Sequence, residues 1–118
     1  MHVLYVEDNS DVRELICWML EEEGLQVVTC SSAQDAEIAF ELQHFDILIT
    51  DVSLPSVPGT ELARRLQMVR PDLWVIFCSG YSMTDGLQAW GSRARNLTKP
   101  FELEELQGLL AECRESLG

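Results

Sequence analysis

Five polar residues that could take part in metal or phosphoryl chemistry follow the apolar runs of this sequence. Glu7 and Asp8 come directly after the first run, and Asp51 comes after the third. Ser79 follows the fourth run, and Lys99 follows the fifth. Three carboxylates held close together raise the pKa of some of them or require a cation, and hard oxygen ligands suit Mg²⁺. The set therefore predicts a magnesium site with a hydroxyl and a lysine beside it.

This combination of groups is suited to phosphoryl transfer, because Mg²⁺ keeps several waters and binds phosphate oxygens. In that scheme Asp51 attacks phosphorus, Lys99 and the metal neutralise charge, and Ser79 donates a hydrogen bond to a phosphoryl oxygen. Each residue alone also has an ordinary explanation, such as a turn former or a first-turn charge that complements a helix dipole. Only their joint placement at the ends of strands favours a site.

The elements that must position these residues alternate along the chain. Short apolar runs predict strands at Val3–Val6, Leu25–Cys30, Ile47–Thr50, Trp74–Cys78 and Asn96–Thr98. Strands that alternate with helices predict a doubly wound α/β fold with a mostly parallel sheet. In such sheets ligands bind beyond the carboxyl ends of the strands, so the polar residues at those ends should converge. A length of 118 residues predicts one domain over residues 1–118.

Apolar residues at helical spacing between the runs predict five helices. The positions expected to face the core are Val12, Leu15, Ile16, Met19 and Leu20, then Ala36, Ala39 and Phe40, then Leu62, Leu66 and Val69, and finally Leu103, Leu106, Leu110, Cys113 and Leu117. The second helix is expected to run from a cap at Ser31–Ser32 to about His44. The fourth, within Ser82–Gly91, should be short or irregular because Gly86 interrupts it.

The composition excludes several classes of function. The formal charge is −12, from 20 acidic and 8 basic residues, which argues against direct binding to nucleic acid or to an anionic membrane. The four cysteines are widely spaced without zinc-site spacing, so reduced and mostly buried thiols are expected. No signal peptide or apolar run of about 20 residues is present, which favours a cytoplasmic location, although a parent protein could be membrane-anchored.

Four sequence blocks resemble the signature blocks of receiver domains from bacterial two-component response regulators. The blocks are Tyr5–Asn9, Ile49–Pro55 with Gly59, Phe77–Tyr81 and Leu97–Phe101, in the family's order and at nearly its spacing. The similarity covers essentially the whole chain. It implies a flavodoxin-like fold with the strand order 2-1-3-4-5.

The resemblance also implies a role for each matching residue. Asp51 would accept phosphate from a phosphohistidine, and Ser79 and Lys99 would hold the phosphoryl oxygens. The implied Mg²⁺ ligands are Glu7 through water, Asp8, Asp51 and the backbone carbonyl of Ser53. The peptide bond between Lys99 and Pro100 would be cis.

The family's biology sets the expected partners. The chain would be a phosphoacceptor that promotes its own phosphorylation and dephosphorylation, not an enzyme acting on other substrates. Its partner would be a histidine kinase or a histidine phosphotransfer domain, docked at the start of the first helix around residues 10–13. A homodimer is compatible with the resemblance.

One position departs from the family pattern. Receivers carry Tyr or Phe three residues before the lysine, as a ring that turns inward on activation, and Asn96 stands there instead. Our hypothesis is that the signal passes through a rearrangement of the following loop or fourth helix, with Tyr81 or Trp90. The alternative is that this face has lost its signalling role or serves only in docking.

A pseudo-receiver that binds proteins without phosphorylation is the main alternative. An aspartyl-phosphate hydrolase is disfavoured because Ser53 stands where that class needs a second Asp. A flavin carrier is disfavoured because Glu7 and Asp8 would repel phosphate. Segments 61–66, 70–73 and 79–81 resemble receivers at the end of hybrid histidine kinases, but a stand-alone regulator shares much of this pattern.

Overall fold

The computed structural model describes residues 1–80, 90–99 and 101–117, which form a five-stranded sheet flanked by helices. The strands are β1 (His2–Val6), β2 (Gln26–Cys30), β3 (Ile47–Asp51), β4 (Trp74–Ser79) and β5 (Ala94–Thr98). All neighbours pair in parallel, in the order β2-β1-β3-β4-β5. The predicted doubly wound fold and its strand order are both confirmed.

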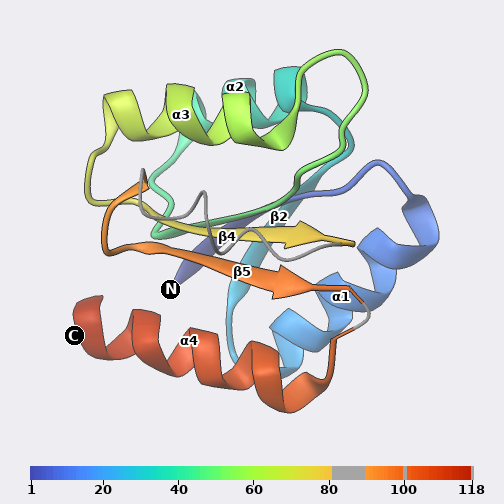
Figure 1. The fold of residues 1–118 in the computed structure, drawn as a ribbon, viewed down its shortest axis with the longest axis vertical. Coiled ribbons are helices and arrows are strands. Elements are labelled where there is room, and N and C mark those ends of the chain that lie inside the picture. The colour runs from blue at the N-terminus through green and yellow to red at the C-terminus, as the bar shows by residue number, and fades with distance from the viewer. Residues whose placement is uncertain (81–89, 100, 118) are drawn as a thin grey trace.

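Helices cover both faces of this sheet. They are α1 (Ser10–Glu22), α2 (Ala33–Leu42), α3 (Gly59–Val69) and α4 (Leu103–Leu117). Figure 1 shows α2 and α3 together on one face and α1 and α4 on the other. The predicted fourth helix falls almost wholly on residues 81–89, outside the described part of the chain, so α4 is the helix predicted as the fifth.

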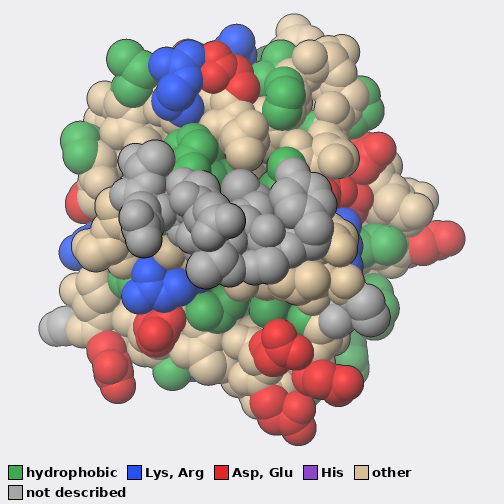
Figure 2. Space-filling model, in the orientation of Figure 1, with side chains coloured by type: hydrophobic (Ala, Val, Ile, Leu, Met, Phe, Trp, Pro, Cys, Tyr) green, Lys and Arg blue, Asp and Glu red, His purple; other side chains and the backbone are tan. Residues whose placement is uncertain are grey.

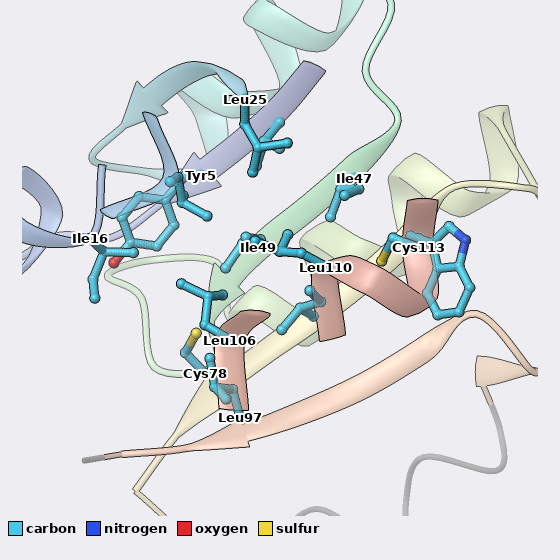
Figure 3. Close-up of a cluster of buried hydrophobic side chains, with 14 residues drawn as sticks. Tyr5, Ile16, Leu25, Ile47, Ile49, Cys78, Leu97, Leu106, Leu110 and Cys113 are labelled. Carbon is cyan, nitrogen blue, oxygen red and sulfur yellow. The ribbon is translucent and has the colours of Figure 1, made fainter. Parts of the chain in front are cut away.

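Two apolar clusters hold the layers together, one on each face of the sheet. Under α1 and α4, Tyr5, Ile16 and Leu110 pack together in the cluster drawn in Figure 3. Under α2 and α3, Leu62 and Phe77 belong to the second cluster. Every residue of β4 is buried, as expected for a central strand that is covered on both faces. The alternation of side chains along each strand therefore supplies both clusters.

Local hydrogen bonds define where the first two helices begin. The side chain of Asn9 accepts from the backbone N–H groups of Asp11 and Val12. Ser32 caps α2 in the same way by accepting from Asp35 N, which agrees with the predicted cap. At the other end of α1, Gly24 has a φ of +84°, a conformation that favours glycine.

Three residues expected to face the core do not. Leu15 is 57% exposed, Val69 is 71% exposed and Leu103 is 42% exposed. Leu15 precedes the buried Ile16 of α1, Val69 is the last residue of α3 and Leu103 is the first residue of α4. The apolar spacing was right for the helices, but it overestimated the width of the face each one buries.

Two element boundaries also differ from the prediction. β5 begins at Ala94 and pairs there with Val75, two residues before the predicted start. The guanidinium of Arg95 lies over the Trp74 ring at 5.2 Å from its centroid, and this contact accommodates a charged residue within the strand. α2 ends at Leu42 because Gln43 is already extended, short of the predicted His44.

The surface is mostly acidic where the helices begin. Glu104 and Glu105 lie in the first turn of α4, and Figure 2 shows acidic side chains gathered in that area at the lower right. Carboxylates there complement the helix dipole.

The four cysteines are free thiols and three are buried, as predicted. Among the described residues, no helix has the length and apolar character needed to cross a membrane.

Candidate functional site

The three predicted carboxylates meet at the carboxyl ends of β1 and β3. Glu7 and Asp8 follow β1, Asp51 is the last residue of β3, and one oxygen from each lies within 4.8 Å of the others. The strands bring them together because β1 and β3 are parallel neighbours, with Val6 opposite Thr50. Glu7 is only 2% exposed, whereas Asp8 is exposed. The sequence-based expectation that these residues converge is confirmed in position.

Lys99 joins two of these carboxylates from the far side of β4. Its Nζ lies 3.0 Å from Glu7 Oε1 and 3.2 Å from Asp51 Oδ2. Burial lowers the pKa of Lys99, but the hydrogen bond that Lys99 donates to Glu7 and the charges of Asp51 and Glu7 raise this pKa above its ordinary value overall. The ammonium is therefore held in its charged form between two acids.

Glu7 is the most enclosed acid of the group. Burial raises the pKa of Glu7, and hydrogen bonds from the Asn9 N–H and the Lys99 ammonium offset only part of that rise. Its own backbone carbonyl accepts from Arg13 Nη1 at 2.9 Å. Within the described residues, Lys99 is the only cation that pairs with this group, which leaves an excess of negative charge. Closely placed oxygen ligands with excess charge fit a hard divalent cation.

The loop after β3 depends on Gly59. A Cβ built on Gly59 would lie 1.9 Å from the backbone oxygen of Asp51 and 2.9 Å from Thr50 Oγ1. The Gly59 N–H also donates to the carbonyl of Val52 at 2.9 Å, which closes the loop. Only glycine permits this approach. The sequence singled out Gly59 as part of a block that resembles receiver domains, and it gave no sign of this contact.

Ser53 lies in the same loop, two residues after Asp51. Its side chain is exposed, and its N–H donates to Asp51 Oδ1 at 3.3 Å. This hydrogen bond orients the acceptor carboxylate together with Lys99. The role of the Ser53 carbonyl as a metal ligand stays a prediction.

Ser79 lies at the end of β4 and is 3% exposed. Its carbonyl accepts from the Lys99 N–H at 2.7 Å, which ties the ends of β4 and β5 together. Its hydroxyl donates to Asn96 Oδ1 at 3.1 Å. The sequence pointed to both residues separately, but it gave no sign of the contact between them.

The features proposed for signal transmission are only partly described. Trp90 packs edge-on against Phe77, with ring centroids 5.0 Å apart. Tyr81 and Pro100 lie outside the described residues, as does the peptide bond predicted to be cis. The hypothesis of a rearrangement in that segment stays a prediction.

An apolar groove opens beside the carboxylates. It has a volume of about 270 Å³ and is lined by residues that include Leu15 and Met19 of α1 together with Lys99 and Phe101. The exposed Leu15, which failed to face the core, borders this groove. Val12, which lies in the docking region predicted at the start of α1, also lines this groove, and Lys99 connects the groove to Asp51.

Comparison with known sequences gives a consistent result. A family described as the response regulator receiver domain matches residues 3–111. The response regulator receiver protein CpdR of Brucella abortus (strain 2308) is 32% identical over 107 residues, which cover 88% of each chain. The cell cycle response regulator CtrA of Brucella ovis is 31% identical over 90% of this chain. The chain spans 47% of the length of CtrA.

Solved structures give the same fold. A response regulator receiver domain protein from Clostridium thermocellum has a TM-score of 0.86 and 25% identity, covering 98% of this chain and 97% of its own. The response regulator protein TrrA of Thermotoga maritima, solved in complex with Mg²⁺ and BeF, has a TM-score of 0.85. It is also 25% identical, over 95% of this chain and 97% of its own.

Proposed function

The chain belongs to the family of response regulator receiver domains of two-component signalling, and we propose that it is a phosphoacceptor that takes a phosphoryl group onto Asp51. The observation that carries the proposal is that Lys99 contacts both Asp51 and Glu7, two of the three carboxylates that lie together with Asp8. This arrangement supports the proposal, because it would hold a nucleophile, a cation and metal ligands close together.

In the proposed reaction an Asp51 oxygen attacks the phosphorus of a phosphohistidine. The new O–P bond forms as the P–N bond breaks, and the imidazole keeps the electron pair and takes a proton from solvent. Lys99 would neutralise charge on the transferring group, and the Ser79 hydroxyl would donate to a phosphoryl oxygen. The same site would later release phosphate by hydrolysis.

The residues fit a divalent cation, and we propose Mg²⁺. Asp8 and Asp51 would hold it directly, Glu7 through water and Ser53 through its carbonyl, all as hard oxygen ligands. When bound, the metal would neutralise charge on the phosphoryl oxygens. Support comes from the distance of 4.8 Å or less between the carboxylate oxygens and from the excess of negative charge. TrrA of Thermotoga maritima, which has the same fold, was solved with Mg²⁺ and BeF.

The proposed partner is a histidine kinase or a histidine phosphotransfer domain. The apolar groove that α1 lines together with Lys99 and Phe101 would receive a partner helix, because Lys99 also contacts Asp51. That the chain is the receiver of a hybrid histidine kinase, or instead a stand-alone regulator, stays a prediction. A cytoplasmic location, a homodimer and a single domain over residues 1–118 stay predictions.

Labelling by acetyl phosphate tests the proposal. We expect Mg²⁺-dependent phosphorylation of the protein, detected by intact-mass spectrometry, and its complete loss in Asp51→Asn. Asp72→Asn is the matched control, because Asp72 precedes β4 at the opposite end of the sheet and is exposed. Absence of labelling in the unaltered protein, with partner binding retained, would establish the pseudo-receiver alternative instead.

A further inference from the structure

A short chain of hydrogen bonds links Ser79 to the edge strand of the sheet. The Ser79 hydroxyl donates to Asn96 Oδ1 at 3.1 Å, and Asn96 Nδ2 donates to Thr98 Oγ1 at 2.9 Å. The register of β4 and β5 places these side chains together, because Phe77 lies opposite Asn96 and Ser79 lies opposite Thr98. Residues at such diagonal positions share one face of a sheet.

A hydroxyl has one proton to donate. In the structure that proton is directed to Asn96, whereas the proposed function requires it to be directed to a phosphoryl oxygen on Asp51. We infer that Asn96 is a positioning residue that holds the Ser79 hydroxyl proton in the unphosphorylated chain and competes for it with the phosphoryl group. This inference rests on the proposed acceptance of phosphate at Asp51.

The surroundings of Ser79 make the competition direct. Ser79 is 3% exposed, so water does not readily replace either partner of its hydroxyl. The hydrogen bond from the Lys99 N–H to the Ser79 carbonyl, at 2.7 Å, fixes the backbone at this point. Rotation of the Ser79 side chain would therefore be enough to direct this proton from Asn96 Oδ1 to the phosphoryl group.

Transfer of this hydrogen bond from Asn96 to the phosphoryl group would also couple phosphorylation of Asp51 to β5. Once Ser79 turns to the phosphoryl group, Asn96 Oδ1 loses its donor, and the amide must find new partners. β5 is an edge strand, and Asn96 also borders a shallow groove against α4. The Asn96 amide thus links the Ser79 hydroxyl to the edge strand.

The test compares beryllofluoride binding in saturating Mg²⁺ by calorimetry. Asn96→Ala removes the competing acceptor, so it should tighten beryllofluoride binding by about twofold to tenfold, the range for one net hydrogen bond. Thr98→Ser is the matched control, because it keeps the hydroxyl that accepts from Asn96 Nδ2, and its affinity should match the unaltered protein. Affinity for Mg²⁺ alone should be the same in all three proteins, because Asn96 contacts none of the carboxylates.

A double-mutant cycle separates positioning from a general structural effect. In a Ser79→Ala background, Asn96→Ala should no longer change beryllofluoride affinity, because the shared proton is gone. An effect that persists in that background, or no effect in the single variant, overturns the inference while the proposed function stands. Absence of beryllofluoride binding in the unaltered protein overturns both.

A second measurement needs no Asn96 variant. In the unaltered protein, the NMR signals of the Asn96 side-chain amide should shift when beryllofluoride binds. In Ser79→Ala this shift should be lost or strongly reduced. Beryllofluoride should still bind to this variant, but with lower affinity. Equal shifts in the two proteins would contradict the inference even if Asn96→Ala failed to fold.

Discussion

The two ends of the parallel sheet each carry a group of charged side chains, and the two groups differ in how fully their charges are paired within the protein. At the amino end, Asp46 accepts from the His2 N–H at 2.9 Å and contacts His44 at 3.1 Å, while Arg70 contacts the other nitrogen of His44 at 2.9 Å. At the carboxyl end, three carboxylates meet one lysine. The amino-end group is satisfied by the protein itself. The carboxyl-end group carries unbalanced charge, which is common where a fold gives up stability for function.

The largest expected effect comes from Gly59, which holds the loop at the carboxyl end. Gly59→Ala would bring a Cβ to 1.9 Å from the Asp51 carbonyl oxygen, so the loop or β3 must move. We expect a loss of about 3 kcal/mol or more in the free energy of unfolding, measured by urea denaturation, and loss of acetyl phosphate labelling.

Gly108→Ala is the matched control for this change. Gly108 lies within α4, and a Cβ there meets nothing within 4 Å. Alanine is the better helix former by about 1 kcal/mol, so this variant should be more stable, with unchanged labelling. Equal stability of the two variants would mean that the loop tolerates a side chain, and that the carboxyl end is less constrained than the structure indicates.

The position of the site followed from the sequence because topology alone determines it. Alternating strands and helices predict a parallel sheet, and the carboxyl ends of its strands bring Glu7, Asp51 and Lys99 to one edge. Contacts that depend on register and rotamer did not follow. The hydrogen bond from Ser79 to Asn96 requires the pairing of β4 with β5, and the start of β5 was itself predicted two residues late. The close approach of Gly59 is a matter of loop shape, for which the sequence has no periodic signal.

The next effect concerns the balanced amino end. Burial raises the pKa of Asp46, but hydrogen bonds from the His2 N–H and from His44 outweigh it and lower this pKa overall. A carboxyl whose pKa is lower in the folded state adds stability above its unfolded pKa of about 4, and that stability is lost as the pH falls through the folded pKa. Asp46→Asn should therefore lower the free energy of unfolding by about 1 kcal/mol at pH 6.

Urea denaturation between pH 6 and pH 3 checks this prediction. The gap between Asp46→Asn and the unaltered protein should shrink as the pH falls, because the aspartate then becomes neutral as well. Asp72→Asn should show a much smaller gap, since the Asp72 side chain is 63% exposed and contacts Arg70 only at 3.5 Å. A gap that stays constant with pH would assign the loss to packing, and the amino end would then not be held by charge.

The smallest effect has the opposite sign and lies at the unbalanced carboxyl end. Asp8 is the exposed member of the three-carboxylate group, and Asp8→Asn removes one like charge from it. Without divalent cations we expect a gain of about 0.5 kcal/mol in the free energy of unfolding, because repulsion within the group falls. Asp11→Asn is the control, because Asp11 complements the dipole at the start of α1 and its loss should destabilise the fold slightly.

Added Mg²⁺ should reverse the order of stability of the unaltered protein and Asp8→Asn. The unaltered protein should be stabilised more, since metal binding to the folded state adds to its stability. If Asp8→Asn is destabilising without metal, the three carboxylates are already balanced, and the two ends of the sheet do not differ in the way proposed.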